Sequence, residues 1–70
     1  MENIQFISVN SSNVKEVGHD GTNLYVRYNS GTYVYENVDK SVYESLLNSE
    51  SKGKFMNENI KGRYNYSRII

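Results

Sequence analysis

The hydrophobic residues of this sequence change their spacing near residue 39, and this change constrains the fold more than any other feature. Before it, apolar and aromatic residues alternate with polar ones, so that Leu24, Val26 and Tyr28 share one face. This pattern is typical of a half-buried β-strand. After it, apolar residues recur every three to four positions, as on one face of a helix. The sequence therefore predicts a sheet first and helices second, an α+β fold.

Two strands joined by a tight turn are expected in the middle of the chain. Glycine adopts the positive φ that such turns often need, so we place the turn at Ser30-Gly31. The apolar faces of the two strands then agree, and Tyr33 and Tyr35 face the predicted core. Whether these two tyrosines also contact a ligand stays open. In this register Tyr28 lies opposite Tyr33, Val26 opposite Tyr35 and Leu24 opposite Asn37.

Asp20-Gly21 predicts a second tight hairpin, between a strand over residues 14–19 and the strand that begins near residue 23. Val14 and Val17 are three positions apart, which breaks the alternation and requires a β-bulge. Residues 1–8 form either an arm or an edge strand. The sequence thus predicts an antiparallel sheet of three to four strands.

Two short helices, packed on one face of this sheet, are expected to follow. Asp39 is a favourable N-cap for a first helix over Lys40–Asn48. The second helical pattern ends at Gly62, a good residue just beyond a helix C-terminus. Residues 67–70 are interpreted as a tail, and residues 1–70 as one domain.

A chain of 70 residues has a thin core, and such domains commonly depend on disulfides, a metal or self-association. The sequence has no cysteine and one histidine, His19, so a disulfide and a four-ligand zinc site are both excluded. We therefore expect a homo-oligomer, a dimer or higher. No signal peptide and no membrane-spanning apolar run are recognisable, so we expect a cytoplasmic protein without membrane contact.

The formal net charge of zero hides an uneven distribution. Residues 1–50 hold three basic and seven acidic groups, whereas residues 51–70 hold five basic and one acidic. The basic part attracts phosphates, and glycines between its cations let backbone N–H groups turn toward an anion. Tyrosines in this part, and a Tyr-Arg pair on the outward face of the sheet, offer flat rings that stack on bases. The candidate nucleic-acid- or phosphate-binding residues are Lys52, Gly53, Lys54, Lys61, Arg63, Tyr64, Tyr66, Arg27 and Tyr25.

Catalytic residues are not indicated. His19, the one side chain with an unperturbed pKa near neutrality, lies beside Asp20 at a predicted turn, where a rigid catalytic pocket is not expected. The chain has no cysteine nucleophile and no glycine-rich phosphate loop. We therefore expect a protein that is not an enzyme and needs no cofactor or metal.

Several short motifs, in this order and at these spacings, resemble the KTSC domain, a short bacterial module also found at the C-terminus of some lysyl-tRNA synthetases. The resemblance covers about residues 9–66. Members of this family tend to carry prolines after the Tyr-x-Tyr strand, where this chain has Asp39, a difference that affects only a helix start. The family has no established activity, and its association with a synthetase implies RNA binding. The motifs are Val14-x-x-Val17-Gly18, Leu24-x-Val26, Gly31-x-Tyr33-x-Tyr35, Val42-Tyr43-x-x-Leu46 and Ser51-x-Gly53-x-Phe55-x-Asn57.

Together these observations predict a non-enzymatic module that binds RNA or a phosphorylated nucleotide through its basic, aromatic C-terminal segment. The alternative is a self-associating interaction module, because tyrosine is common at interfaces and the apolar pair Ile69-Ile70 needs a docking surface. A phage-type protein that stoichiometrically sequesters a host factor or a signalling nucleotide belongs to the same alternative. The ten asparagines and the lack of alanine and proline are typical of an AT-rich bacterial or phage genome.

Overall fold

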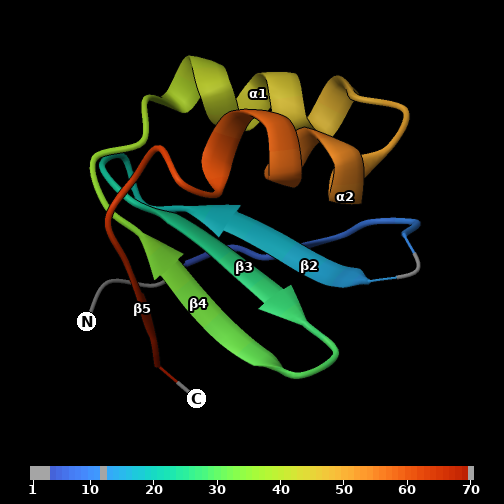
Figure 1. Cartoon of the computed structure of the whole chain (residues 1–70), viewed down its shortest axis with the longest axis horizontal. Helices are drawn as coiled ribbons and strands as arrows, with labels where there is room; N and C mark the ends of the chain where they lie inside the picture. Colours follow the sequence, from blue (N-terminus) through green and yellow to red (C-terminus); the bar gives the residue numbers. More distant parts are fainter. Residues whose placement is uncertain (1–3, 12, 70) are drawn as a thin grey trace.

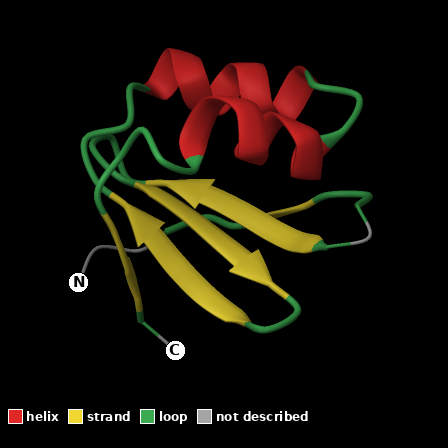
Figure 2. Ribbon diagram, in the orientation of Figure 1, coloured by secondary structure: helices red, strands yellow, loops and turns green. Residues whose placement is uncertain are grey.

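The computed structural model describes residues 4–11 and 13–69, and the Ile70 member of the terminal apolar pair lies outside them. A five-stranded antiparallel sheet is covered on one face by helices (Figures 1 and 2). The α+β prediction is confirmed. The elements are β1 (Ile7–Ser8), β2 (Val14–His19), β3 (Leu24–Tyr28), β4 (Gly31–Tyr35), α1 (Lys40–Asn48), α2 (Lys52–Phe55), the π-helical η1 (Met56–Ile60) and β5 (Tyr66–Arg68).

The predicted number of strands, three to four, is wrong because both edge strands are short. The strand order is β1-β2-β3-β4-β5, so each strand pairs with the preceding strand of the chain. β1 and β5 have two and three residues, too few to show an alternating pattern in the sequence. The prediction of a tail over residues 67–70 is therefore wrong at its start, since Ser67 and Arg68 pair with β4.

The predicted register of β3 and β4 is also wrong, by two residues. Leu24 lies opposite Tyr35, Val26 opposite Tyr33 and Tyr28 opposite Gly31. The turn is therefore Asn29-Ser30 and not Ser30-Gly31. A shift of two residues keeps every side chain on its face, so the apolar pattern fits both registers equally well.

The bulge is confirmed, and a hairpin does form at Asp20-Gly21, although its loop is longer than the tight turn expected. The register of β2 against β3 shifts between Val14 and Glu16, which makes Lys15 the extra residue of a β-bulge. His19 lies opposite Leu24, so the connecting loop is residues 20–23.

The core lies between the sheet and the helices. Helix α1 begins and ends as predicted, although the Asp39 side chain makes no capping hydrogen bond. Leu46 on α1 and Met56 and Ile60 on η1 are completely buried. Met56 and Ile60 are four residues apart, so they lie on the same face of the helix and both reach the core. The sheet contributes fully or almost fully buried side chains to the same core: Val14, Val17, Leu24, Val26 and Tyr35.

The N-terminal segment passes behind the sheet, on the face away from the helices (Figure 1). A Cβ at Gly18 would lie 2.8 Å from Ile4 Cγ2 and 3.2 Å from the Gln5 carbonyl oxygen. Because Gly18 has no side chain, Ile4 and Gln5 can pack closely against β2 at this position. The Phe6 ring meets the Tyr25 ring edge-on, with centroids 6.4 Å apart, and Tyr25 is buried.

The loop between β2 and β3 generates a pH-dependent prediction. Asp20 Oδ1 accepts hydrogen bonds from the Asn23 and Thr22 N–H groups at 2.8 and 2.9 Å, and Oδ2 accepts one from the Tyr25 hydroxyl. These bonds, the Asn23 bond foremost, hold the pKa of Asp20 below its usual value of 3.8. The charged carboxylate therefore stabilises the fold above that pH, and the contribution is lost as the pH falls through the lower, folded-state value.

We expect Asp20→Asn to weaken the pH dependence of stability. Urea unfolding at about pH 7 and about pH 3 should show a smaller difference in the free energy of unfolding for the variant than for the original chain. Asp39→Asn is the control, because the Asp39 side chain makes no capping bond. Equal pH dependence in Asp20→Asn and the original chain would contradict the assignment.

Candidate functional site

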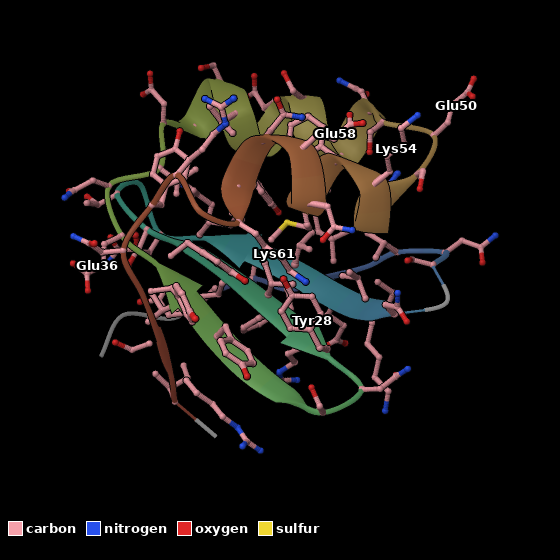
Figure 3. All side chains as sticks on the ribbon, viewed as in Figure 1. Tyr28, Glu36, Glu50, Lys54, Glu58 and Lys61 are labelled. Atoms are coloured by element: carbon pink, nitrogen blue, oxygen red, sulfur yellow. The ribbon has the colours of Figure 1, made fainter. Side chains whose placement is uncertain are left out.

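A groove of about 660 Å³ lies between the α2–η1 helix and strands β3, β4 and β5, a volume typical of small-ligand sites. Gly53, Asn57 and Lys61 line its helical side at intervals of four residues. The π-turn, in which the Lys61 N–H donates to the Met56 carbonyl oxygen at 2.8 Å, ends this stripe. Figure 3 shows Lys61 beside Tyr28, between the helices and the sheet.

The sheet side of the groove is a tyrosine cluster, defined as Tyr28, Tyr33, Tyr35 and Tyr66. The Tyr28 and Tyr33 rings meet edge to face, with centroids 5.4 Å apart. The Tyr66 ring lies 5.9 Å from Tyr33 and 5.7 Å from Tyr35. The hydroxyls of Tyr28 and Tyr35 share a hydrogen bond of 2.8 Å. Each tyrosine therefore touches two others, which fixes the cluster from three different strands.

The electrostatics of the groove favour an anion. Burial, followed by the hydrogen bond to Tyr35, raises the pKa of Tyr28, and burial raises the pKa of Tyr35. These hydroxyls therefore stay neutral at physiological pH. The Lys61 ammonium lies 5.3 Å from the centroid of the Tyr28 ring, within cation–π range. Among the described residues that line the groove, Lys61 carries the one formal charge and no Asp or Glu is present.

The structure brings three of the residues predicted from the sequence into the groove: Gly53, Lys61 and Tyr66. A Cβ at Gly53 would meet only the Asn13 side chain, at an ordinary contact distance of 3.9 Å, so the packing there does not require glycine. Tyr66 is 58% exposed, so much of its surface is accessible to a ligand.

Other basic residues of the C-terminal segment make different contacts. Lys52 Nζ donates to the carbonyl oxygens of Ser49 and Leu47 at 2.6 and 3.1 Å, just after and within the end of α1. Lys54 lies on the outer side of the helix layer, away from Lys61 (Figure 3). Arg63 Nε donates to the Glu58 carbonyl oxygen at 3.3 Å. Of the Lys52-Gly53-Lys54 segment, Gly53 lines the groove and the two lysines do not.

Three predicted aromatic or basic residues also lie outside the groove. Tyr64 is half-buried against the core. Tyr25 is buried on the far face of the sheet, where its hydroxyl donates to Asp20. Arg27 donates to Glu16 Oε1 at 2.8 Å, and its guanidinium lies 4.5 Å from the centroid of the Phe6 ring.

Sequence reasoning missed Tyr28 and Asn57 as site residues and left Tyr33 and Tyr35 open. The structure shows that Tyr35 is a core residue and Tyr33 is half-buried, and that both line the groove. The Tyr-x-Tyr motif and the spacing of Asn57, four residues from Gly53 and from Lys61, were the available signals.

His19 has a structural role at the C-terminal end of β2, whereas Val14 at the N-terminal end lines the groove. Its Nε2–H donates to the Val38 carbonyl oxygen at 2.6 Å, and its Nδ1 accepts from the Gly21 N–H at 3.0 Å. The ring also stacks on Tyr43, with centroids 5.4 Å apart. Within residues 4–11 and 13–69, no group of three potential metal-ligating side chains is found. No helix in this part of the chain is long and apolar enough to span a bilayer.

Comparison with known proteins identifies the family. The sequence matches the KTSC domain over residues 10–64. The chain belongs to the KTSC domain family. A crystal structure of a KTSC domain protein from Yersinia pestis superimposes with a TM-score of 0.93 at 28% identity, over 97% of this chain and 100% of that one. A protein of Tsukamurella paurometabola is 37% identical over an alignment of 59 residues that covers 80% of this chain and 88% of the relative. In this KTSC domain the Tyr-x-Tyr motif, Tyr33 and Tyr35, lies on β4 and forms part of the groove wall.

The contacts of Lys52 and Lys54 predict different effects on stability. Lys52→Met should lower the free energy of unfolding by about 1 kcal/mol, because two carbonyl groups near the end of α1 lose their partner. Lys54→Met should change it by less than about 0.5 kcal/mol, the usual range for a surface substitution. Urea unfolding of both variants measures the difference, and equal effects would contradict a structural role for Lys52.

Proposed function

We propose that this KTSC domain is a non-enzymatic cytoplasmic module that binds RNA or a phosphorylated nucleotide in the groove. The observation that carries the proposal is the pairing of the tyrosine cluster with Lys61, in a groove whose described lining holds no carboxylate. Flat rings stack on bases, and an ammonium group attracts a phosphate. The proposed site thus contains fewer residues of the basic segment than the sequence predicted, and it adds residues of the sheet.

The polar groups of the groove suit the edges of a base or a sugar. Asn57 on η1 and Asn13, which immediately precedes β2, carry side-chain amides that both donate and accept hydrogen bonds. The neutral hydroxyls of Tyr28 and Tyr35 do the same, so the groove offers several polar contacts without a second charge. The groove by itself therefore suits a flat ring system with one phosphate near Lys61.

A non-enzymatic role is supported by the positions of the general-base candidates. Both nitrogens of His19 are engaged with backbone groups, away from the groove. Burial raises the pKa of the Tyr28 and Tyr35 hydroxyls. This disfavours both hydroxyls as bases or nucleophiles at neutral pH.

Substitutions in the groove test the proposal. Lys61→Ala should weaken binding of uridine or adenosine monophosphate about ten- to hundredfold, as expected for a charge-assisted contact of about 1.5–3 kcal/mol. Tyr66→Ala should weaken it by about the same factor through the loss of stacking. NMR chemical-shift titration gives the affinities and also shows which residues respond.

Two comparison variants make this test specific. Lys40→Ala removes an exposed cation at the start of α1 and should leave the affinity unchanged. Lys54→Ala should weaken binding less than Lys61→Ala, because Lys54 lies on the outer side of the helices. Equal affinities of the Lys61→Ala and Lys40→Ala variants would contradict the groove as the site.

Self-association is a second candidate function, favoured by the exposed edge of the sheet at β5. The Asn65 carbonyl accepts from the Glu36 N–H just after β4, and the Ile69 N–H donates to the Thr32 carbonyl on β4. The backbone of Tyr66, between them, therefore faces the outer side of the strand. Tyr66 and Ile69 are 58% and 44% exposed, and edge strands of this kind pair readily with another strand.

Sedimentation equilibrium tests this second candidate. A dimer or larger oligomer, with a mass at least twice the 8.1 kDa of one chain, is expected at high protein concentration. Ile69→Asp should shift the protein toward the monomer, because a charge on an edge strand opposes pairing. Ser45→Asp adds the same charge at an exposed position of α1 and should not. A monomer at every concentration would reject self-association.

A further inference from the structure

A second hollow, of about 610 Å³, lies against the turn between β3 and β4. Three cationic side chains line it, those of Lys15, Arg27 and Arg68, together with one carboxylate, Glu16. The Arg27–Glu16 ion pair, at 2.8 Å, compensates one positive charge. We call this second hollow the basic hollow. Its lining therefore holds more basic than acidic side chains.

The basic hollow is continuous with the groove. Tyr28, Asn29 and Ser30 line both, so one strip of surface joins them across the turn. Arg68 Nη2 donates to the Ser30 carbonyl oxygen at 2.8 Å, which holds the guanidinium at this boundary. Lys61 lies against Tyr28 on the groove side. Cations therefore flank the shared strip on both sides.

Local structure explains why Lys15 faces this region. It is the extra residue of the β-bulge in β2, and a bulge redirects a side chain relative to the regular strand. Its own carbonyl accepts a hydrogen bond from the Val9 N–H at 3.0 Å, so its backbone is fixed while its side chain is exposed. Removal of the Lys15 side chain should therefore leave the fold intact.

From this continuity we infer that the ligand is a single-stranded polynucleotide that occupies the groove and the basic hollow together. Bases stack on the tyrosine cluster, the backbone crosses the Asn29-Ser30 turn, and following phosphates lie near Lys15 and Arg68. A mononucleotide would fill the groove but leave the basic hollow empty, so the second set of cations contributes only to a longer chain. The inference rests on the proposed function and specifies its substrate class.

The test compares ligand length and salt dependence. Uridine monophosphate and oligouridylates of about two to eight nucleotides are titrated into the original chain, which should bind the longer ligands at least about tenfold more tightly. Lys15→Ala should weaken oligouridylate binding several-fold and reduce the slope of log affinity against log salt by about 0.7 for each phosphate that the protein no longer neutralises. The same variant should bind uridine monophosphate as the original chain does.

Three further samples control the result. Arg68→Ala should weaken oligouridylate binding and reduce the salt slope as Lys15→Ala does. Arg68→Ala also removes the hydrogen bond to Ser30, so if β5 unfolds in this variant, the result for Lys15→Ala decides between the outcomes. Lys40→Ala, on α1, should retain the original affinity and slope. A duplex of the same length should bind more weakly, because its base faces are hidden from the tyrosine cluster.

The outcomes separate the inference from the proposal on which it rests. If affinity does not rise with length, or if Lys15→Ala keeps the original salt slope while Lys61→Ala still weakens binding, the continuous path is overturned and the groove stands. If neither uridine monophosphate nor the oligouridylates bind, both are overturned. Length-dependent affinity with a reduced slope in Lys15→Ala supports both.

Discussion

The packing of the helix layer on the sheet is the contact on which the rest of this structure depends. Leu46, Met56 and Ile60 are buried completely against a sheet face that includes Leu24 and Val26. In so small a domain this layer holds most of the apolar area removed from water, and no disulfide supplements it. Because Met56 is anchored in the core, the neighbouring positions of the same helix are fixed above the sheet. The position of the groove follows from the core.

The tyrosine cluster shows how one set of side chains can serve both the core and a surface. Tyr35 is buried and shares a hydroxyl hydrogen bond with Tyr28, whereas Tyr66 on the edge strand is largely exposed. A tyrosine can do this because its ring is apolar and its hydroxyl is polar, so one end packs while the other stays near solvent. In the proposed function, the rigid contacts among the rings would also reduce the entropy lost on binding a flat ligand.

The candidate site was only partly predictable from the sequence. Lys61 and Tyr66 were recognised because charge and aromatic residues are concentrated near the C-terminus. Lys52 has the same chemistry and a similar context, yet its ammonium group binds carbonyls near the end of α1. Composition gives the types of groups available, but not the direction of a long flexible side chain. Tyr28 was missed because it is distant in sequence from Lys61, and only the folded chain brings the two together.

The sequence by itself determined the α+β class, the presence of a bulge between Val14 and Val17 and the bounds of α1, since each depends on local periodicity and turn chemistry. Only the tertiary structure decided the register of β3 and β4 and the pairing of β5. A two-residue shift leaves the apolar pattern unchanged, and a strand of three residues carries too little pattern to be recognised. The pairing of β5 with β4 also joins segments that are about 30 residues apart in the chain. The groove, which these two pairings create, is therefore a property of the folded molecule.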